Sequence, residues 1–229
     1  MMNMKYKYIT LIPARGGSKR FPGKNTHVLN GSPLICHSIE YSLKNPKVQG
    51  TYVSTDAEDI KSISSVAGAE IIDRPDELAG DYATSASVMK HAVEYLMAKG
   101  VEFDYVILLQ ATNPLRPRGL LDEAIDIIEK TGSTSLFTVT RSEKKLGKIV
   151  EGKYVPWNYT FGMRSQDMDP LYYENGLLYI TSKELLLKEI IEGQDAYPLV
   201  VDHPFGEVDI DTREDFEYAK FILSQYGHE

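Results

Sequence analysis

A loop rich in glycine and cationic side chains follows the first apolar segment of the chain. Residues Tyr8 to Ile12 are typical of a buried β-strand, and the next residues read Pro13-Ala14-Arg15-Gly16-Gly17-Ser18-Lys19-Arg20-Phe21-Pro22-Gly23-Lys24-Asn25. Glycines allow backbone N–H groups to approach phosphate oxygens. Arg15 offers a bidentate fork, while Lys19 and Lys24 are mobile point charges. We therefore predict that this loop binds a polyphosphate rather than serving only as a solvated basic turn.

The loop does not have the spacing of a Walker-type P-loop, G-x-x-x-x-G-K-[ST]. Gly17 and Gly23 are one residue too far apart, and Lys24 is followed by Asn25. Pro22 also disfavours a smooth passage from loop into helix. The spacing therefore excludes a kinase or ATPase loop of this kind.

A second chemical signal is the alternation Val208-Asp209-Ile210-Asp211-Thr212 near the end of the chain. In a strand, Asp209 and Asp211 would point to the same face. Adjacent carboxylates repel each other unless a cation or a proton lies between them. Magnesium is often held by one or two carboxylates plus substrate phosphates, so a Mg²⁺ site is predicted. The alternative is that Asp211 or Thr212 caps the helix that follows.

Two further segments carry polar residues at places where ligands bind. Gln110 ends the apolar run that begins at Tyr105 and is predicted to contact a substrate. Asn113 and Arg116 each precede a proline, so we expect them to shape the turn. The connection Arg74–Ser85 is longer than most and is expected to line the same site.

Composition limits the classes of function. The chain has 229 residues with a net charge of −8, from 25 basic and 33 acidic residues. This balance argues against non-specific nucleic-acid binding. Cys36 is the single cysteine, so an internal disulfide is excluded, and no Cys/His cluster has zinc spacing. No apolar run reaches membrane-spanning length, and we expect a cytoplasmic protein with one domain over residues 1–229.

Strand and helix patterns alternate along most of the chain, which is typical of an α/β fold with a parallel sheet and helices on both faces. The predicted strands are Tyr6–Ala14, Thr51–Ser54, Glu70–Ile72, Tyr105–Gln110, Leu136–Thr140, Gly176–Thr181 and Tyr197–Val201. The predicted helices are Pro33–Leu43, Ala57–Ala67, Ser85–Met97, Arg118–Lys130, Ser182–Ile191 and Arg213–Tyr226. Right-handed crossovers place the carboxyl ends of the strands at one edge, where the polar residues above would meet.

The pattern changes over about residues 141–172. Glu151-Gly152 indicates a hairpin turn between Lys148–Val150 and Lys153–Trp157, and Trp157 is the only tryptophan. This excursion is either a surface hairpin or an arm that mediates dimerisation.

Several segments, in order, resemble the acylneuraminate cytidylyltransferase family, the CMP-sialic acid or CMP-nonulosonic acid synthetases. The resemblance covers nearly the whole chain and is carried by Ile12–Asn25, Arg74–Ser85, Leu109–Arg116, Glu174-Asn175-Gly176 with Tyr179-Ile180, and Asp209-Ile210-Asp211-Thr212.

The resemblance implies a Rossmann-like, nucleotide-diphospho-sugar transferase fold and transfer of CMP from CTP to a nine-carbon α-keto sugar acid, with release of pyrophosphate. It implies a homodimer whose arm is the excursion, and Mg²⁺ on Asp209 and Asp211. Catalytic roles fall to Arg15, Lys24 and Asp211. The implied nucleotide-binding residues are Ala14, Arg15, Gly16, Gly17, Ser18, Lys19, Lys24, Asn25, Arg74, Ala83 and Ser85, and the implied sugar-binding residues are Gln110, Lys148, Arg164 and Tyr179.

One departure concerns the sugar pocket, because a His-His-Pro-like stretch of the better-known members reads Lys144-Lys145-Leu146 here. The acceptor stays open among N-acetylneuraminate, its deaminated form (Kdn), legionaminate and pseudaminate. A CMP-Kdo synthetase, another sugar nucleotidyltransferase and a non-catalytic nucleotide-binding module are the alternatives.

Overall fold

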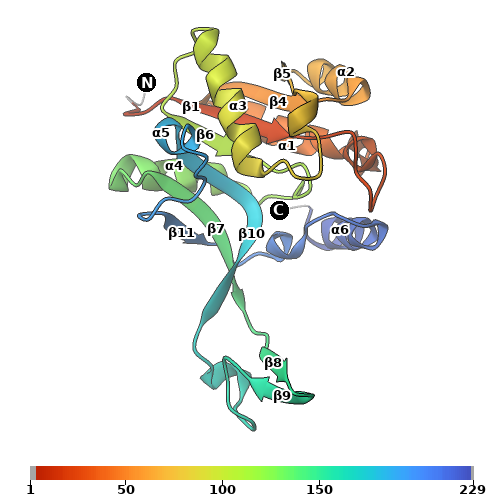
Figure 1. Cartoon of the computed structure of the whole chain (residues 1–229), viewed down its shortest axis with the longest axis vertical. Coiled ribbons are helices and arrows are strands. Elements are labelled where there is room, and N and C mark those ends of the chain that lie inside the picture. Colours follow the sequence, from red (N-terminus) through yellow and green to blue (C-terminus); the bar gives the residue numbers. More distant parts are fainter. Residues whose placement is uncertain (1–3, 228–229) are drawn as a thin grey trace.

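The computed structural model describes residues 4–227, so the predicted domain limits at residues 1 and 229 lie outside it. Its centre is a seven-stranded sheet in the order β11-β7-β10-β6-β1-β4-β5 (Figure 1). Every pair in this sheet is parallel except those of β10, which runs antiparallel to β6 and β7. The predicted mostly parallel α/β fold is confirmed. The strands are β1 (Tyr8–Pro13), β4 (Val48–Thr55), β5 (Glu70–Asp73), β6 (Tyr105–Leu108), β7 (Ser135–Ser142), β10 (Leu171–Ser182) and β11 (Tyr197–Val200).

Helices cover both faces of this sheet. One apolar cluster packs residues of α1 (Leu34–Leu43), α2 (Glu58–Val66) and α4 (Leu120–Thr131) against the first face. A second cluster packs α3 (Ser85–Ala98) and α5 (Lys183–Leu186) against the other. In β1, Tyr8 and Ile12 join the first cluster, while Ile9 and Leu11 join the second. This period of two is what a strand buried on both faces requires.

A third apolar cluster holds the final helix, α6 (Arg213–Tyr226), against the loop that follows β1. The Phe21 ring of that loop lies 5.7 Å from the Phe216 ring of α6, measured between centroids. Val208 and Ile210 are buried in the same cluster, which directs Asp209 between them and Asp211 after them outward. Packing therefore fixes the cationic loop and the acid pair to one another.

The short elements at the carboxyl edge of the sheet complete this region. They are η1 (Lys24–Thr26), β2 (Val28–Leu29), β3 (Ser32–Pro33), η2 (Asp76–Leu78) and η4 (Pro204–Glu207). Strands β2 and β3 pair as a hairpin that turns through Asn30 and Gly31, both at positive φ.

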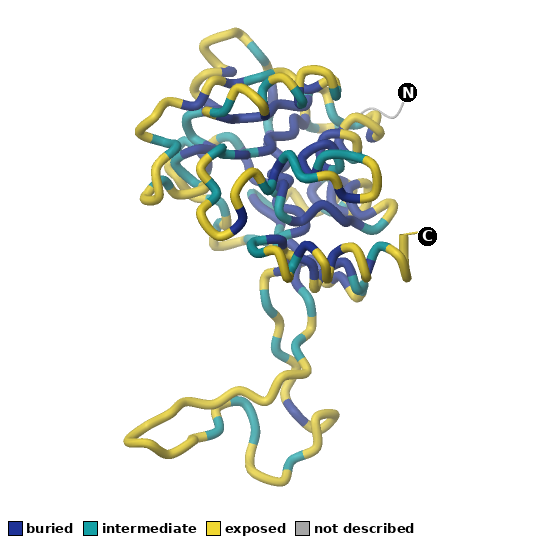
Figure 2. Tube along the Cα trace, turned by 90° about the vertical axis from the view of Figure 1, so that its right-hand side faces the viewer, coloured by how far each residue is buried: buried dark blue, intermediate teal, exposed yellow. Residues whose placement is uncertain are grey.

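Strands β7 and β10 continue beyond the core as a ribbon that ends in the hairpin of β8 (Gly147–Val150) and β9 (Lys153–Pro156) (Figure 1). The hairpin turns at Glu151 (φ 50°) and Gly152 (φ 75°), and two positive φ values define a type I′ turn. The predicted hairpin is confirmed. After η3 (Ser165–Asp167) the chain returns to β10, and most of this excursion is exposed (Figure 2).

Two expectations about local structure are wrong. The predicted helix Ser182–Ile191 is reduced to α5 (Lys183–Leu186), because Glu189 adopts a left-handed conformation (φ 59°) and the Ile190 N–H folds back onto the Leu185 carbonyl. The acid pair does not lie in a strand but in the irregular segment between η4 and α6. Within residues 4–227, no helix has the length and apolar character needed to cross a bilayer.

Candidate active site

A cavity of about 600 Å³ lies where the loop after β1, the β5–α3 connection, the turn after β6 and the segment before α6 meet. Its wall contains most residues that the sequence analysis assigned to nucleotide and metal. The assigned residues that line it are Ala14, Arg15, Ser18, Lys19, Lys24, Asn25, Arg74, Ala83, Ser85, Gln110, Asp209 and Asp211. Separate parts of the sequence thus converge on one site.

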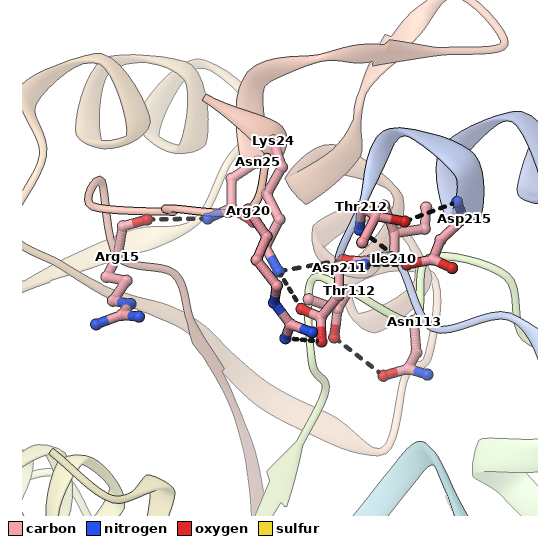
Figure 3. Close-up of polar contacts among 10 residues, drawn as sticks. All are labelled: Arg15, Arg20, Lys24, Asn25, Thr112, Asn113, Ile210, Asp211, Thr212 and Asp215. Atoms are coloured by element: carbon pink, nitrogen blue, oxygen red, sulfur yellow. Dashed lines mark hydrogen bonds and ion pairs between the residues drawn. The ribbon is translucent and has the colours of Figure 1, made fainter. Parts of the chain in front are cut away.

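Lys24 contacts Asp211 of the acid pair directly. Its Nζ donates hydrogen bonds to Oδ1 of Asp211 at 2.8 Å and to the Ile210 carbonyl at 3.1 Å (Figure 3). Arg20 forms an ion pair with the other oxygen of Asp211. Only 12% of the Lys24 side chain is exposed, so this ammonium is held at the floor of the cavity.

The loop itself is fixed by backbone contacts. Asn25 is buried, and its amide nitrogen donates to the Arg15 carbonyl at 3.1 Å (Figure 3). The Gly16 N–H donates to Asp56 at 3.0 Å, and a Cβ at Gly16 would lie 2.7 Å from that of Ala57. Gly16 and Gly17 do not line the cavity. Because Gly16 has no side chain, the loop packs closely against the start of α2. The Gly16 N–H is already hydrogen-bonded to Asp56.

Asp81 neutralises two of the predicted phosphate-binding cations. Its carboxylate lies 3.2 Å from Nη1 of Arg15 and forms an ion pair with Lys19. Hydrogen bonding to Lys19, and then to Arg15, lowers the pKa of Asp81 below its ordinary value. The sequence analysis gave Asp81 no separate role, although it lies in the long Arg74–Ser85 connection.

Arg74 is a rigid part of the cavity wall. Its Nη2 donates to the Ser54 carbonyl at 2.6 Å, and its Nε donates to the Ser54 hydroxyl at 3.3 Å. Burial lowers the pKa of Arg74 to about 10, so the guanidinium stays protonated at neutral pH. The side chain therefore extends from the end of β5 to the end of β4 and places its charge in the cavity wall.

The start of α6 shows that Thr212, and not Asp211, caps the helix. Thr212 accepts a hydrogen bond from the Asp215 N–H at 3.2 Å, and Asp215 accepts one from the Thr212 N–H at 2.8 Å. This capping box leaves the Asp209 and Asp211 side chains free of any capping role. Although solvent reaches Asp209, crowding by protein atoms raises the pKa of its carboxyl, and the Asp211 charge raises it further.

A magnesium ion at the two carboxylates would need further ligands from a substrate. Among residues 4–227, no group of three or more His, Cys, Asp or Glu residues could hold a metal ion. Asp209 and Asp211 would supply two oxygens at the edge of the cavity, and phosphate and water would supply the rest.

A second cavity, of about 540 Å³, adjoins the first, since Gln110 and Asp209 line both. Tyr179 also lines it, and its hydroxyl donates to Glu174 at 3.3 Å. Three further charged residues line this wall, and the sequence analysis assigned none of them a contact with a ligand, although it noted Lys144 in the stretch that departs from the family's sugar pocket. These are Lys144, Glu174 and Glu207.

Lys148 and Arg164, which the resemblance assigns to sugar binding, line neither cavity of this chain. Lys148 lies on the exposed strand β8. Arg164 donates two hydrogen bonds to Asp167, at 2.8 and 3.0 Å. Within one chain, the structure does not bring these two residues to Gln110 and Tyr179.

Asn113 and Arg116 have the predicted structural role. Asn113 donates to the carbonyls of Asn175 (3.1 Å) and Val208 (2.8 Å). Arg116 is buried and donates to the Leu177 carbonyl at 2.6 Å, to the Ser38 hydroxyl at 2.9 Å and to the Gln110 carbonyl at 2.9 Å. These contacts join the turn after β6 to β10 and to the segment that carries the acids.

The chain has the fold of the nucleotidyltransferases. The structure of a 4-diphosphocytidyl-2C-methyl-D-erythritol synthase superposes with a TM-score of 0.70 at 14% identity, covering 96% of this chain and 100% of that one. The structure of a CMP:2-keto-3-deoxy-manno-octonic acid synthetase in complex with CTP gives 0.68 at 18% identity, covering 96% and 99%. At these identities the likeness is one of fold.

The chain belongs to the cytidylyltransferase family, whose model matches residues 9–226. The pseudaminic acid cytidylyltransferase of Campylobacter jejuni is 35% identical over 231 residues, covering 97% of this chain and 98% of that protein. The CMP-N,N'-diacetyllegionaminic acid synthase of Legionella pneumophila is 32% identical over 237 residues, covering 95% and 96%. The resemblance found in the sequence is confirmed.

Proposed function

We propose that this chain transfers CMP from CTP to the anomeric hydroxyl of a nonulosonic acid and releases pyrophosphate. The observation that carries the proposal is the pair of adjoining cavities. One joins Arg15, Lys24 and the two acids, and it shares Gln110 and Asp209 with the other. The relatives named above are a pseudaminic acid cytidylyltransferase and a CMP-N,N'-diacetyllegionaminic acid synthase, which supports an acceptor of this class.

In the proposed complex, the larger cavity holds CTP. The cationic side chains of Arg15, Lys19 and Lys24 neutralise the triphosphate, and Ser18 lies on the same wall. Arg74, Ala83 and Ser85 contact cytosine, and Asn25 contacts the ribose. Nucleotidyl transfer depends chiefly on positioning and on neutralisation of charge, which these residues supply.

Asp209 and Asp211 would hold Mg²⁺ together with the phosphates, and the ion, when bound, neutralises phosphate charge. We propose that Asp211 also accepts the proton of the attacking hydroxyl. The acceptor oxygen then bonds to the α-phosphorus as the bond from that phosphorus to pyrophosphate breaks. Gln110 and Tyr179 would orient the acceptor in the smaller cavity.

We further propose that a second copy of the chain covers the excursion. Large apolar side chains there are exposed in one chain, among them Ile149 (72%), Trp157 (63%) and Phe161 (73%). A two-stranded hairpin is marginal on its own, and such surfaces mark interaction sites. A homodimer would bury them. We propose that this CTP-consuming reaction takes place in the cytoplasm.

Pyrophosphate release with Mg²⁺ and CTP tests the function. The acids compared are pseudaminate, legionaminate, N-acetylneuraminate, Kdn and Kdo. We expect release with at least one nine-carbon acid and little release when CTP is replaced by UTP or ATP. Release with Kdo alone would indicate a CMP-Kdo synthetase, the alternative that acts on an eight-carbon acid. CTP binding without release for any acid would contradict transfer to these acids and favour a non-catalytic module.

A further inference from the structure

The smaller cavity has an uneven distribution of charge. Its wall carries three carboxylates, from Glu174, Glu207 and Asp209, and one cationic side chain, Lys144. The nonulosonic acid of the proposed function is itself an anion. Such a ligand is repelled by most of this wall and attracted at one place.

The backbone of Lys144 is anchored where the ribbon leaves the core. Its N–H donates to the Ser142 hydroxyl at 3.3 Å, and its carbonyl accepts from the Asn158 amide at 2.9 Å. Its Nζ lies 6.0 Å from the centroid of the Tyr173 ring. The Tyr173 hydroxyl in turn hydrogen-bonds to Glu207 on the same wall. The lysine therefore extends along the cavity.

The ammonium of Lys144 is in no ion pair with any residue in the described range 4–227. The three acids have other neighbours. Glu174 and Glu207 accept hydrogen bonds from Tyr179 and Tyr173, and Asp209 lies beside Asp211 and Thr112. A cation that has an aromatic neighbour but no ion pair, in an acidic cavity, is a natural partner for an anionic group of a ligand.

Chemistry fixes which group of the acceptor must lie there. In the ring form of an α-keto acid, the carboxylate and the anomeric hydroxyl are attached to the same carbon. The hydroxyl must face the larger cavity, across the boundary formed by Gln110 and Asp209. The carboxylate is thereby confined to the near part of the smaller cavity, among the acids.

We propose that Lys144 binds the carboxylate of the acceptor within the same chain and so determines both specificity for an acid and the orientation of the attacking hydroxyl. This inference rests on the proposed function. It differs from the assignment implied by the resemblance, in which Lys148 and Arg164 contact the sugar, since neither reaches the cavity of its own chain. Glu174 and Glu207 then accept hydrogen bonds from hydroxyl or amide groups elsewhere on the sugar.

Three lysines of one segment allow a matched test. Lys144→Gln is compared with Lys145→Gln, whose Nζ donates to the Met163 carbonyl outside both cavities, and with Lys148→Gln. We expect Lys144→Gln to raise the KM for the acid about tenfold or more, as for loss of a charged hydrogen bond. The KM for CTP should stay within about twofold in all three variants, and Lys144→Arg should retain most of the affinity for the acid.

A binding measurement tests the role of Lys144 without requiring that the enzyme turn over. The acid and its methyl ester are titrated into each protein by calorimetry in the presence of CMP. Wild type should prefer the acid, and Lys144→Gln should bind acid and ester alike. An undiminished preference in Lys144→Gln, or an effect confined to Lys148→Gln, would overturn the proposal. Absence of pyrophosphate release by wild type, with acid binding intact, would instead contradict the proposed function.

Discussion

Asp211 contacts both the cationic loop and the start of α6. Lys24 and Arg20 each pair with one of its carboxylate oxygens, and its own N–H donates to Asp215 (Figure 3). Because Thr212 caps α6, the Asp211 carboxylate has no structural duty there. The simplest account is that CTP and Mg²⁺ replace the two cations as its partners.

Asp211→Asn should therefore abolish activity without affecting the fold. We expect kcat to fall at least about 100-fold, as for loss of a group that stabilises transition-state charge. The melting temperature should stay within about 2 °C of wild type, since the change is at a partly exposed side chain. Steady-state kinetics, thermal unfolding and the Mg²⁺ dependence of CTP binding check this.

The matched control is Asp202→Asn, which alters an exposed carboxylate outside both cavities. It should leave kcat unchanged. Near-normal turnover of Asp211→Asn at physiological Mg²⁺ would show that Asp211 neither holds the metal nor accepts the proton.

Asp81 competes with phosphate for Arg15 and Lys19. Asp81→Asn is expected to bind pyrophosphate up to about fivefold more tightly, because an exposed ion pair of this kind is worth less than about 1 kcal/mol. Calorimetry at low and moderate salt measures the effect, with Glu102→Gln as a control that removes the partner of Lys7 outside the cavity. Weaker pyrophosphate binding would mean that Asp81 positions the cations instead.

At the scale of elements, Arg116 holds together the turn after β6, strand β10 and helix α1. Its guanidinium bonds acceptors on all three, and the residue is buried. The same turn carries Gln110, which lines both cavities. The stability of the fold and the position of Gln110 therefore depend on the same hydrogen bonds of Arg116.

Arg116→Ala should destabilise the chain strongly, because several buried acceptors would lose their donors. We expect a loss on the order of 3 kcal/mol in the free energy of unfolding, or roughly 6–12 °C in melting temperature. Arg118→Ala, at a nearby exposed position, should change it little. A melting temperature for Arg116→Ala equal to that of Arg118→Ala would refute the structural role.

The elements also show what could be predicted from the sequence. Buried strands follow from local composition and period, so β1 and β6 are predicted correctly, and Arg15 lies in the wall of the cavity. The ion pairs of Asp81 join segments more than 60 residues apart, and no local pattern specifies them. The regular alternation of Asp209 and Asp211 suggested a strand, but it arises because Val208 and Ile210 pack under α6.

At the scale of the whole molecule, the ribbon of β7 and β10 carries an exposed apolar hairpin away from the core (Figures 1 and 2). Ile149→Asp and Phe161→Asp should weaken the proposed dimer, since each would bury a charge in its interface. Sedimentation should show twice the chain mass of 25.8 kDa for wild type and a shift toward one chain for the variants.

Val66→Asp, at an apolar side chain of α2 that is 89% exposed, is the control and should leave the mass unchanged. A wild-type chain that sediments as a monomer at micromolar concentration would contradict the dimer. The apolar side chains of the hairpin would then remain exposed to solvent.

The central claim, transfer of CMP to a nonulosonic acid, is tested most directly by ³¹P NMR of a reaction with CTP, MgCl₂ and the acid that the release assay selects. We predict a new phosphodiester signal and pyrophosphate in equal amounts, both absent when the acid is left out. Formation of free CMP and pyrophosphate without a phosphodiester would indicate hydrolysis. Formation of CDP would indicate transfer of the terminal phosphate, and either result would contradict the account.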